Sequence, residues 1–168
     1  MLLCAVALCG SFLTQWDGVT HVKKRQKVCV SVYKEAERQK VDPVLAVAVA
    51  WIESGFIASA KSSAGAVGPM QVMPQFWCPG GKRKGCKLIK EGVRALKYYV
   101  DRYGVNSGLC AYASGKPCIK AGRAASVYRS KVIDLALGID LIHQQQCVED
   151  RCGEALEMLH NGQCPEGC

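Results

Sequence analysis

Apolar residues recur at three- and four-residue intervals along most of the chain, which is the periodicity of amphipathic α-helices. This pattern predicts helices over residues 26–40, from Pro43 to Gly55, over 89–103 and over 125 to about 146, with a short helix from Pro74. In the first of these, the apolar stripe consists of Cys29, Val32, Tyr33 and Ala36, and charged residues fill the other face. No stretch alternates as a strand would, so we expect a mainly α fold.

The helix that begins at Pro43 is apolar almost all round, which predicts that it is the buried central helix. Asp42 supplies an N-cap and Pro43 suits the first helical turn, while Gly55 ends the helix. Glu53 therefore lies in the last turn. Burial and the negative end of the helix dipole both raise the pKa of a carboxyl group placed there. The alternative is that Glu53 is a helix-end carboxylate paired with a Lys or Arg.

The chain has 168 residues, of which 49% are hydrophobic and 7% aromatic, with no internal repeat and no linker. This size and composition indicate a single helical domain. We expect a signal peptide over residues 1–20, the folded domain over 21–146, and a Cys-rich C-terminal tail over 147–168 that packs on the domain.

Residues 1–14 are almost entirely apolar. The run is shorter than the roughly 20 residues that span a bilayer, but it has the length of a signal-peptide core. It predicts export to the periplasm or the medium. The alternative is an N-terminal core helix.

Cysteine content supports export independently of the leader. Setting aside Cys4 and Cys9 leaves nine of the 11 cysteines, a density typical of oxidising compartments. The expected disulfides join neighbours in sequence, with Cys29 as the odd thiol: Cys78 with Cys86, Cys110 with Cys118, Cys147 with Cys152, and Cys164 with Cys168. The alternative for the tail is a zinc site made by Cys147, Cys152, Cys164 and Cys168, with His143 and His160 nearby.

The formal charge is +8, with a pI near 9.0, which favours a polyanionic partner such as nucleic acid, an anionic membrane or an acidic cell-wall polymer. Two basic runs are the candidate contacts, or simply solvated surface: Lys23, Lys24, Arg25 and Lys27, and Lys82, Arg83, Lys84 and Lys87. Neither run is interleaved with aromatic residues and no nucleic-acid-reading motif is present, so we expect no nucleic-acid partner.

A carboxylic acid with a raised pKa suits glycosidic cleavage, in which the leaving oxygen must receive a proton. Most glycosidases add a second carboxylate. Here Asp42 is expected to be a helix cap and Glu91 a solvated helix position, so no second acid stands out. A substrate with an N-acetyl group can supply the nucleophile itself, which leaves Glu53 to act alone.

Motifs around Glu53 resemble a known family. Glu53-Ser54-Gly55-Phe56, the run Ser62-Ser63-Ala64-Gly65-Ala66-Val67-Gly68-Pro69-Met70-Gln71 with Met73-Pro74, then Ala111-Tyr112-Ala113-Ser114-Gly115, and finally Tyr128 with Lys131-Val132 follow one another in the family's order. This set resembles the catalytic core of the soluble lytic transglycosylases over about residues 41–132. The resemblance implies a lysozyme-like domain, related to goose-type lysozyme, that uses no cofactor and no metal.

The resemblance also implies roles for individual residues. Glu53 matches the catalytic acid/base, and Ser54 matches the polar residue that supports it, although it also suits a helix cap. Tyr112 matches the tyrosine near the catalytic carboxyl, and Tyr128 matches a second cleft tyrosine or, alternatively, a core residue. Gly65 and Gly68 would let the loop backbone approach a glycan, or are ordinary turn glycines. The residues expected to bind substrate are Ser54, Ser62, Gly68, Met70, Gln71, Tyr112 and Tyr128.

Three positions depart from the family pattern. Pro69 stands in place of Leu, and Ala113 and Ser114 stand in place of Asn and Ala. The lost Asn puts specificity or efficiency in question more than the reaction class, and a Cys110–Cys118 disulfide is expected to order this loop instead.

The expected function is that of a monomeric peptidoglycan lytic transglycosylase, which cleaves the MurNAc-β-1,4-GlcNAc bond and leaves a 1,6-anhydro ring. The alternatives are a hydrolytic lysozyme of the same fold, and a non-catalytic wall-binding module of a secretion, conjugation or virion assembly. The expected partner is the peptidoglycan glycan strand.

Overall fold

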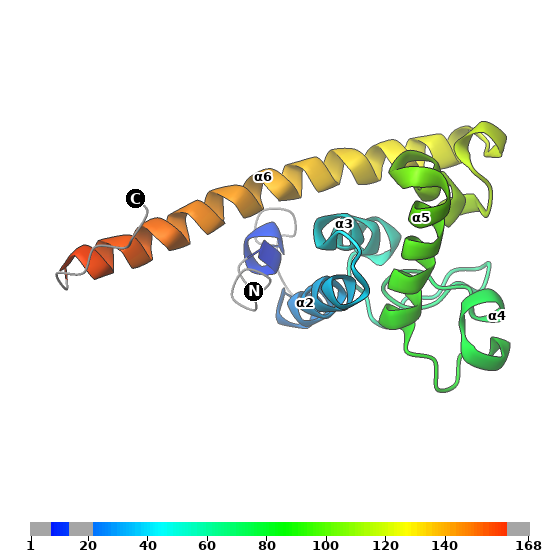
Figure 1. The fold of residues 1–168 in the computed structure, drawn as a ribbon. Coiled ribbons are helices and arrows are strands. Elements are labelled where there is room, and N and C mark those ends of the chain that lie inside the picture. Colours follow the sequence, from blue (N-terminus) through cyan, green and yellow to red (C-terminus); the bar gives the residue numbers. More distant parts are fainter. Residues whose placement is uncertain (1–7, 14–21, 161–168) are drawn as a thin grey trace.

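The computed structural model describes residues 8–13 and 22–160, with side chains described up to residue 141. From residue 22 onwards, five helices follow one another, with two short 3₁₀ turns between them (Figure 1). They are α2 (Val22–Gln39), α3 (Pro43–Ser54), α4 (Pro74–Trp77), α5 (Leu88–Ser114) and α6 (Arg123–His160), and the turns are η1 (Pro79–Gly81) and η2 (Cys118–Lys120). The predicted mainly α, lysozyme-like class with disulfide-bonded loops is confirmed.

Helix α3 is the centre of the core. The Asp42 side chain caps it by accepting from the N–H groups of Val44, at 2.9 Å, and Leu45, at 3.3 Å. All seven residues from Val44 to Ala50 are buried, because α3 is covered by α2 on one side and α6 on another. The prediction of a buried central helix is confirmed, and its burial sets the environment of the residues that follow in its last turn.

Helix α5 contains two helical segments. They meet at Gly104, whose φ of 71° and ψ of 168° interrupt the helical backbone. The first segment matches the helix predicted to stop at Gly104. The second, which ends at Ser114 with Gly115 in a left-handed cap, was not predicted. It carries Tyr112, so this unpredicted half turns out to position a residue of the site.

Helix α6 begins at Arg123 and continues to His160, beyond the predicted end near residue 146. Residues 139–160 contain one glycine and no proline, so nothing in the sequence stops the helix there. Figure 1 shows its C-terminal half running past the other helices. The expectations for the tail lie outside the described side chains. They are its packing on the domain, the Cys147–Cys152 and Cys164–Cys168 disulfides, and the alternative zinc site.

A helical segment at residues 8–13 lies against α2 and α3. Leu8, Cys9, Phe12 and Leu13 are fully buried in it, and the Phe12 ring lies 5.1 Å from the ring of Trp51. This packing brings Cys9 to Cys29, and the two form a disulfide. The expectation that Cys29 is the odd thiol is therefore wrong, because it assumed that Cys9 was absent from the folded domain.

The signal peptide stays a prediction, since residues 1–7 and 14–21 lie outside the described part. Cleavage after residue 20 would remove Cys9 and leave Cys29 without its partner. Within the described residues, no helix has the length and apolar character needed to cross a membrane.

Two of the disulfides predicted from the sequence are confirmed, and both lie in loops. Cys78 is bonded to Cys86, and Cys110 to Cys118. Each closes a short loop beside one end of α5, and both loops adjoin residues of the candidate site.

Candidate active site

Glu53 lies in the last turn of α3, as predicted. Gly55 ends the helix in the left-handed conformation at φ 58°, and its N–H donates to the Trp51 carbonyl at 2.7 Å. The next residue, Phe56, also has a positive φ of 61°, and its side chain is buried against Trp51 and Phe12. This turn fixes the direction in which the chain leaves the helix, and with it the position of the Glu53 carboxyl group.

The Glu53 carboxyl group has one aromatic hydroxyl as its hydrogen-bond donor. The Tyr128 hydroxyl donates to Glu53 Oε1 at 2.7 Å. Burial raises the pKa of Glu53 to about 7, and the Tyr128 hydrogen bond partly opposes that rise because it favours the ionised carboxylate. At neutral pH, Glu53 is therefore poised between its acid and base forms.

Tyr112 lies in the same group of residues without bonding the carboxyl. Its hydroxyl donates to the Met70 carbonyl at 2.7 Å. Burial raises the pKa of Tyr112 well above its usual value, and the nearby Glu53 charge adds to the rise. Burial and the Glu53 charge act on the pKa of Tyr128 in the same way. The resemblance implied that the Tyr112 hydroxyl lies close to the carboxyl. In the structure, Tyr112 is near enough for the Glu53 charge to raise its pKa, and the Tyr128 hydroxyl bonds the carboxyl directly.

Ser54 connects the helix end to the loop that follows. Its hydroxyl donates to the Pro69 carbonyl at 2.8 Å and accepts from the Ile57 N–H at 3.1 Å. These two bonds hold residue 69 beside the end of α3. Ser54 thus joins the last turn of α3 to the loop that follows, and its role in supporting Glu53 stays a prediction.

Gln71 follows in a strained conformation. Its φ of 46° lies in the left-handed region, and its Nε2 donates to the Gly68 carbonyl at 2.9 Å. One of the two amide N–H groups is therefore used within the loop. Together with Ser54 and Tyr112, this bond holds residues 68–71 at three points.

The glycine at position 68 is needed for packing. Gly68 has a φ of 79°, and a Cβ atom there would lie 2.7 Å from Leu88 Cδ1 and 3.0 Å from Leu88 Cβ. Gly65 also has a positive φ, of 88°, but nothing lies within 4 Å of its missing Cβ. Leu88, in the first turn of α5, makes the close approach to Gly68. Gly68 is therefore the point at which this loop packs against α5.

The Met70 side chain lies in the core. It is fully buried, and a Cβ atom on Gly92 of α5 would lie 2.6 Å from Met70 Cβ. Ser62, another predicted contact, closes a turn in the same loop: its Oγ accepts from the Ala66 N–H at 3.0 Å. The structure thus gives Met70 and Ser62 roles in shaping the loop.

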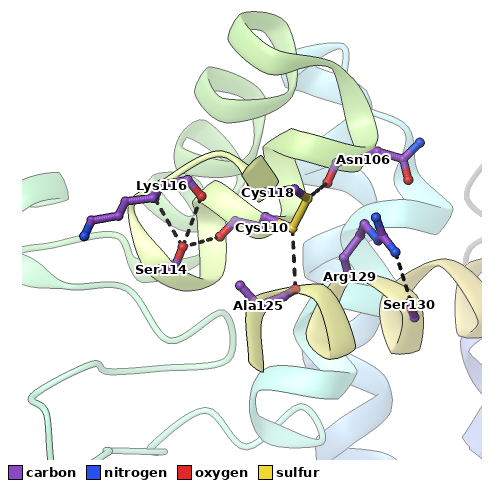
Figure 2. The surroundings of a disulfide bond; sticks show 8 residues. All are labelled: Asn106, Cys110, Ser114, Lys116, Cys118, Ala125, Arg129 and Ser130. Carbon is purple, nitrogen blue, oxygen red and sulfur yellow. Dashed lines mark hydrogen bonds between the residues drawn. A yellow bond between two sulfur atoms is a disulfide. The ribbon is translucent and has the colours of Figure 1, made fainter. Parts of the chain in front are cut away.

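Ser114, one of the residues that depart from the family pattern, and the Cys110–Cys118 disulfide organise the end of α5 (Figure 2). The Ser114 hydroxyl donates to the Cys110 carbonyl at 2.8 Å and accepts from the Lys116 N–H at 3.2 Å. The Cys110–Cys118 disulfide joins this helix end to η2, and Cys110 Sγ lies 3.6 Å from the Ala125 carbonyl oxygen of α6. The bond therefore braces the connection between Tyr112 on α5 and Tyr128 on α6.

The prediction that Glu91 is solvated is wrong. Its side chain is buried, and its Oε2 lies 2.6 Å from Arg94 Nε in an ionic contact. Glu91 follows Lys90 and precedes two apolar residues, so the sequence alone gave no signal of its burial. Asp42 caps α3 as predicted. Among the described residues, no three His, Cys, Asp or Glu side chains gather as a metal site would require.

A family model described as the transglycosylase SLT domain matches residues 31–131. The matched span contains Glu53, the 62–71 loop, Tyr112 and Tyr128. No solved structure matches the chain. The family match covers more than half of the 168 residues. The chain therefore belongs to the transglycosylase SLT domain family, whose members carry out transglycosylase chemistry on peptidoglycan.

Proposed function

We propose that the protein is a peptidoglycan lytic transglycosylase that cleaves the MurNAc-β-1,4-GlcNAc bond and forms a 1,6-anhydro ring on the muramyl residue. The observation that carries this proposal is the state of Glu53. It is a partly buried carboxyl with a pKa of about 7, bonded by a tyrosine hydroxyl at 2.7 Å. Such a group can give a proton and take it back at neutral pH.

In the first step, neutral Glu53 donates its proton to the glycosidic oxygen. The substrate's acetamido carbonyl oxygen attacks the anomeric carbon, and the electrons of the breaking C–O bond leave with the protonated oxygen. A cyclic, positively charged intermediate and the Glu53 carboxylate result. No second protein carboxylate is needed, in keeping with a Glu91 that is committed to Arg94.

In the second step, the Glu53 carboxylate takes the proton of the muramyl 6-hydroxyl. That oxygen attacks the anomeric carbon and expels the acetamido oxygen, which closes the anhydro ring and restores neutral Glu53. The Tyr128 hydroxyl stabilises the carboxylate between the two steps, because a hydrogen bond to an ionised oxygen is stronger than one to a neutral oxygen.

Glycan binding is assigned to the loop at residues 62–71 and to the two tyrosines. The second amide N–H of Gln71 is the group we assign to a sugar hydroxyl or acetamido oxygen, since the first is bonded to Gly68. Ser54, Ser62, Gly68 and Met70 support binding by holding the loop. Their contacts within the protein favour this supporting role.

The altered Ala111–Gly115 motif is the one feature that favours the non-catalytic alternative. Ala113 is exposed and leaves the family's Asn contact unmade, but Ser114 and the Cys110–Cys118 bond still order the helix end. With Glu53 and Tyr128 also in contact, the geometry supports an enzyme.

Export to the periplasm or the medium is part of the proposal. The three disulfides of the described residues suit an oxidising compartment, which is also where peptidoglycan lies. A secretion, conjugation or virion assembly would be the setting for a small wall-cleaving domain of this kind.

Turnover of purified peptidoglycan by Glu53→Gln tests the assignment of the acid. We expect clearing of a sacculus suspension by the wild-type protein and none by the variant. The matched control is Asp134→Asn, which makes the same carboxyl-to-amide change at an exposed position on α6 and should clear the suspension at the wild-type rate. Activity in a folded Glu53→Gln protein would refute the proposed role.

A further inference from the structure

Charge is distributed unevenly along the chain, and the two segments that carry most of the site residues, 54–90 and 102–133, are purely basic. Residues 54–90 contain six cations and no acid: Lys61, Lys82, Arg83, Lys84, Lys87 and Lys90. Residues 102–133 also contain six cations and no acid. These two segments supply every residue assigned to the site except Glu53. All 14 acidic residues of the chain lie outside them, so both segments carry charge of a single sign.

Within these two segments, the cations are densest in one loop. The basic loop, residues 78–87, is closed by the Cys78–Cys86 disulfide, and Lys82, Arg83, Lys84 and Lys87 are all exposed on it. A loop closed by a covalent bond loses less conformational freedom when it binds a ligand than an open loop does. The closed loop therefore presents its cations at a fixed place.

The base of the basic loop is held by α5. Arg94 Nη2 donates to the Trp77 carbonyl at 2.6 Å, and the guanidinium group lies 5.5 Å from the centre of the Trp77 ring. Arg94 is also paired with buried Glu91. These contacts use Arg94 within the protein and leave the exposed cations of the loop to face a ligand.

Ring contacts join the basic loop to the site. The Trp77 ring lies 5.7 Å from Tyr99, and Tyr99 lies 6.4 Å from Tyr112. Tyr112 in turn bonds the Met70 carbonyl. Helix α4, which leads into the loop, begins at Pro74, three residues after Gln71, and Figure 1 shows it beside α5. The basic loop thus lies at the edge of the site.

We propose that the basic loop binds the carboxylates of the peptide stems of peptidoglycan. This inference rests on the proposed function, since it concerns the same substrate. Every muramyl residue carries a stem on its lactyl group, and the stem has several free carboxylates, whereas N-acetylglucosamine is uncharged. A glycan seated at Glu53 therefore brings carboxylates to the edge of the site. Phe76, whose side chain is 73% exposed beside the loop, offers an apolar surface to the aliphatic parts of the stem.

The test compares two soluble glycans that differ only in stem charge, one with free stem carboxylates and one with the same carboxylates amidated. The variant is Lys82→Gln/Lys84→Gln. The matched control is Lys34→Gln/Lys40→Gln, which removes two exposed lysines from α2 and the turn that follows it. For the free-carboxylate glycan at low ionic strength, we expect the loop variant to raise KM about fivefold, and added salt to reduce the difference. The control should match the wild type.

Amidation separates this inference from the proposed function. The wild-type protein should still cleave the amidated glycan. On this glycan, the KM of the wild type and the KM of the loop variant should be about equal. Failure to cleave either glycan would count against the proposed function. Cleavage of both glycans with an equal KM for wild type and loop variant would overturn the stem-binding inference alone. An equal effect of the loop variant and the control variant on KM would overturn it too. So would tighter binding of a polyphosphate wall polymer than of the carboxylate stems.

Discussion

Two opposing effects set the protonation of Glu53. Burial raises its pKa to about 7, and the hydroxyl of Tyr128 limits that rise by bonding the carboxylate. A single residue that acts first as acid and then as base requires this balance, since a carboxyl fixed in either form could perform only one of the two steps.

The rate should follow the ionisation of Glu53. We expect kcat/KM to fall about tenfold per pH unit above about pH 7, as Glu53 loses the proton that it must donate. Tyr128→Phe removes the bond that favours the carboxylate, so it should move this limb to higher pH by about one unit and lower the maximal rate roughly tenfold. A pH profile of soluble-glycan cleavage measures both effects.

Tyr112→Phe is the matched control for Tyr128→Phe. It removes a hydroxyl that bonds the Met70 carbonyl, so it should lower the rate while the limb stays in place. If both variants shift the limb equally, the separate roles given to the two tyrosines are wrong.

Burial of Glu53 should also affect stability. Because its pKa is 4.5 when unfolded and about 7 when folded, the unfolded state releases the proton first as pH rises. The stability gained from holding the proton is present below about pH 4.5 and is lost by about pH 7. Glu53→Gln should therefore be more stable than the wild type by about 3 kcal/mol at pH 8 and about equal to it at pH 4. Urea unfolding at the two pH values checks this. A difference that is constant with pH would contradict the raised pKa.

At the scale of single residues, the sequence predicted the position of Glu53 in the last turn of α3 and the Asp42 cap, because local patterns determine both. The bond from Tyr128 to Glu53 spans 75 positions and depends on how α6 crosses α3, which local patterns do not contain. The buried Glu91 was missed for the same reason, since its environment is made by Arg94 and by neighbouring elements.

Among the structural elements, the connection from α5 to α6 determines where both tyrosines lie. The Cys110–Cys118 bond closes this connection beside the start of α6 (Figure 2). Cys110→Ser/Cys118→Ser should lower kcat several-fold and cost about 2–3 kcal/mol of stability. Cys78→Ser/Cys86→Ser opens a loop with the same sequence separation of eight, and should act on KM instead. Kinetics of both folded proteins compare them, and an unchanged kcat in the first would rule out the bracing role.

The loop before α4 offers a test of packing against backbone conformation. Gly65→Ala and Gly68→Ala both place a side chain at positive φ, which costs about 1–2 kcal/mol. Only Gly68→Ala also meets Leu88, so it should lose roughly 1–2 kcal/mol more and lower activity. Thermal unfolding of the two variants measures the difference. Equal losses would mean that the contact with Leu88 contributes nothing.

The limits of a helix were predictable where residues next to its ends determine them. Asp42, Gly55 and Gly104 gave the limits of α3 and of the first part of α5. The second half of α5 was not predicted, because Asn106, Ser107 and Gly108 are weak helix formers and follow directly on Gly104. The length of α6 was underestimated because polar residues after 141 obscured a run that nothing interrupts.

For the whole molecule, the N-terminal segment and the charge distribution matter most. Residues 8–13 complete the core and pair Cys9 with Cys29, so they contribute to the domain as well as to the predicted leader. The net charge of +8 arises mainly from the segments around the site, since all the acids lie elsewhere. Both features fit a domain that works outside the cytoplasm on an anionic polymer.

Mass analysis of the soluble fragments released from purified peptidoglycan tests the central claim most directly. The account predicts that the wild-type protein releases muropeptides ending in 1,6-anhydroMurNAc, lighter by one water than hydrolysed ends, and that Glu53→Gln releases none. Hydrolysed ends as the main product of the wild-type protein would make it a lysozyme. They would contradict the proposed second step, in which Glu53 takes the proton of the muramyl 6-hydroxyl and that oxygen closes the anhydro ring.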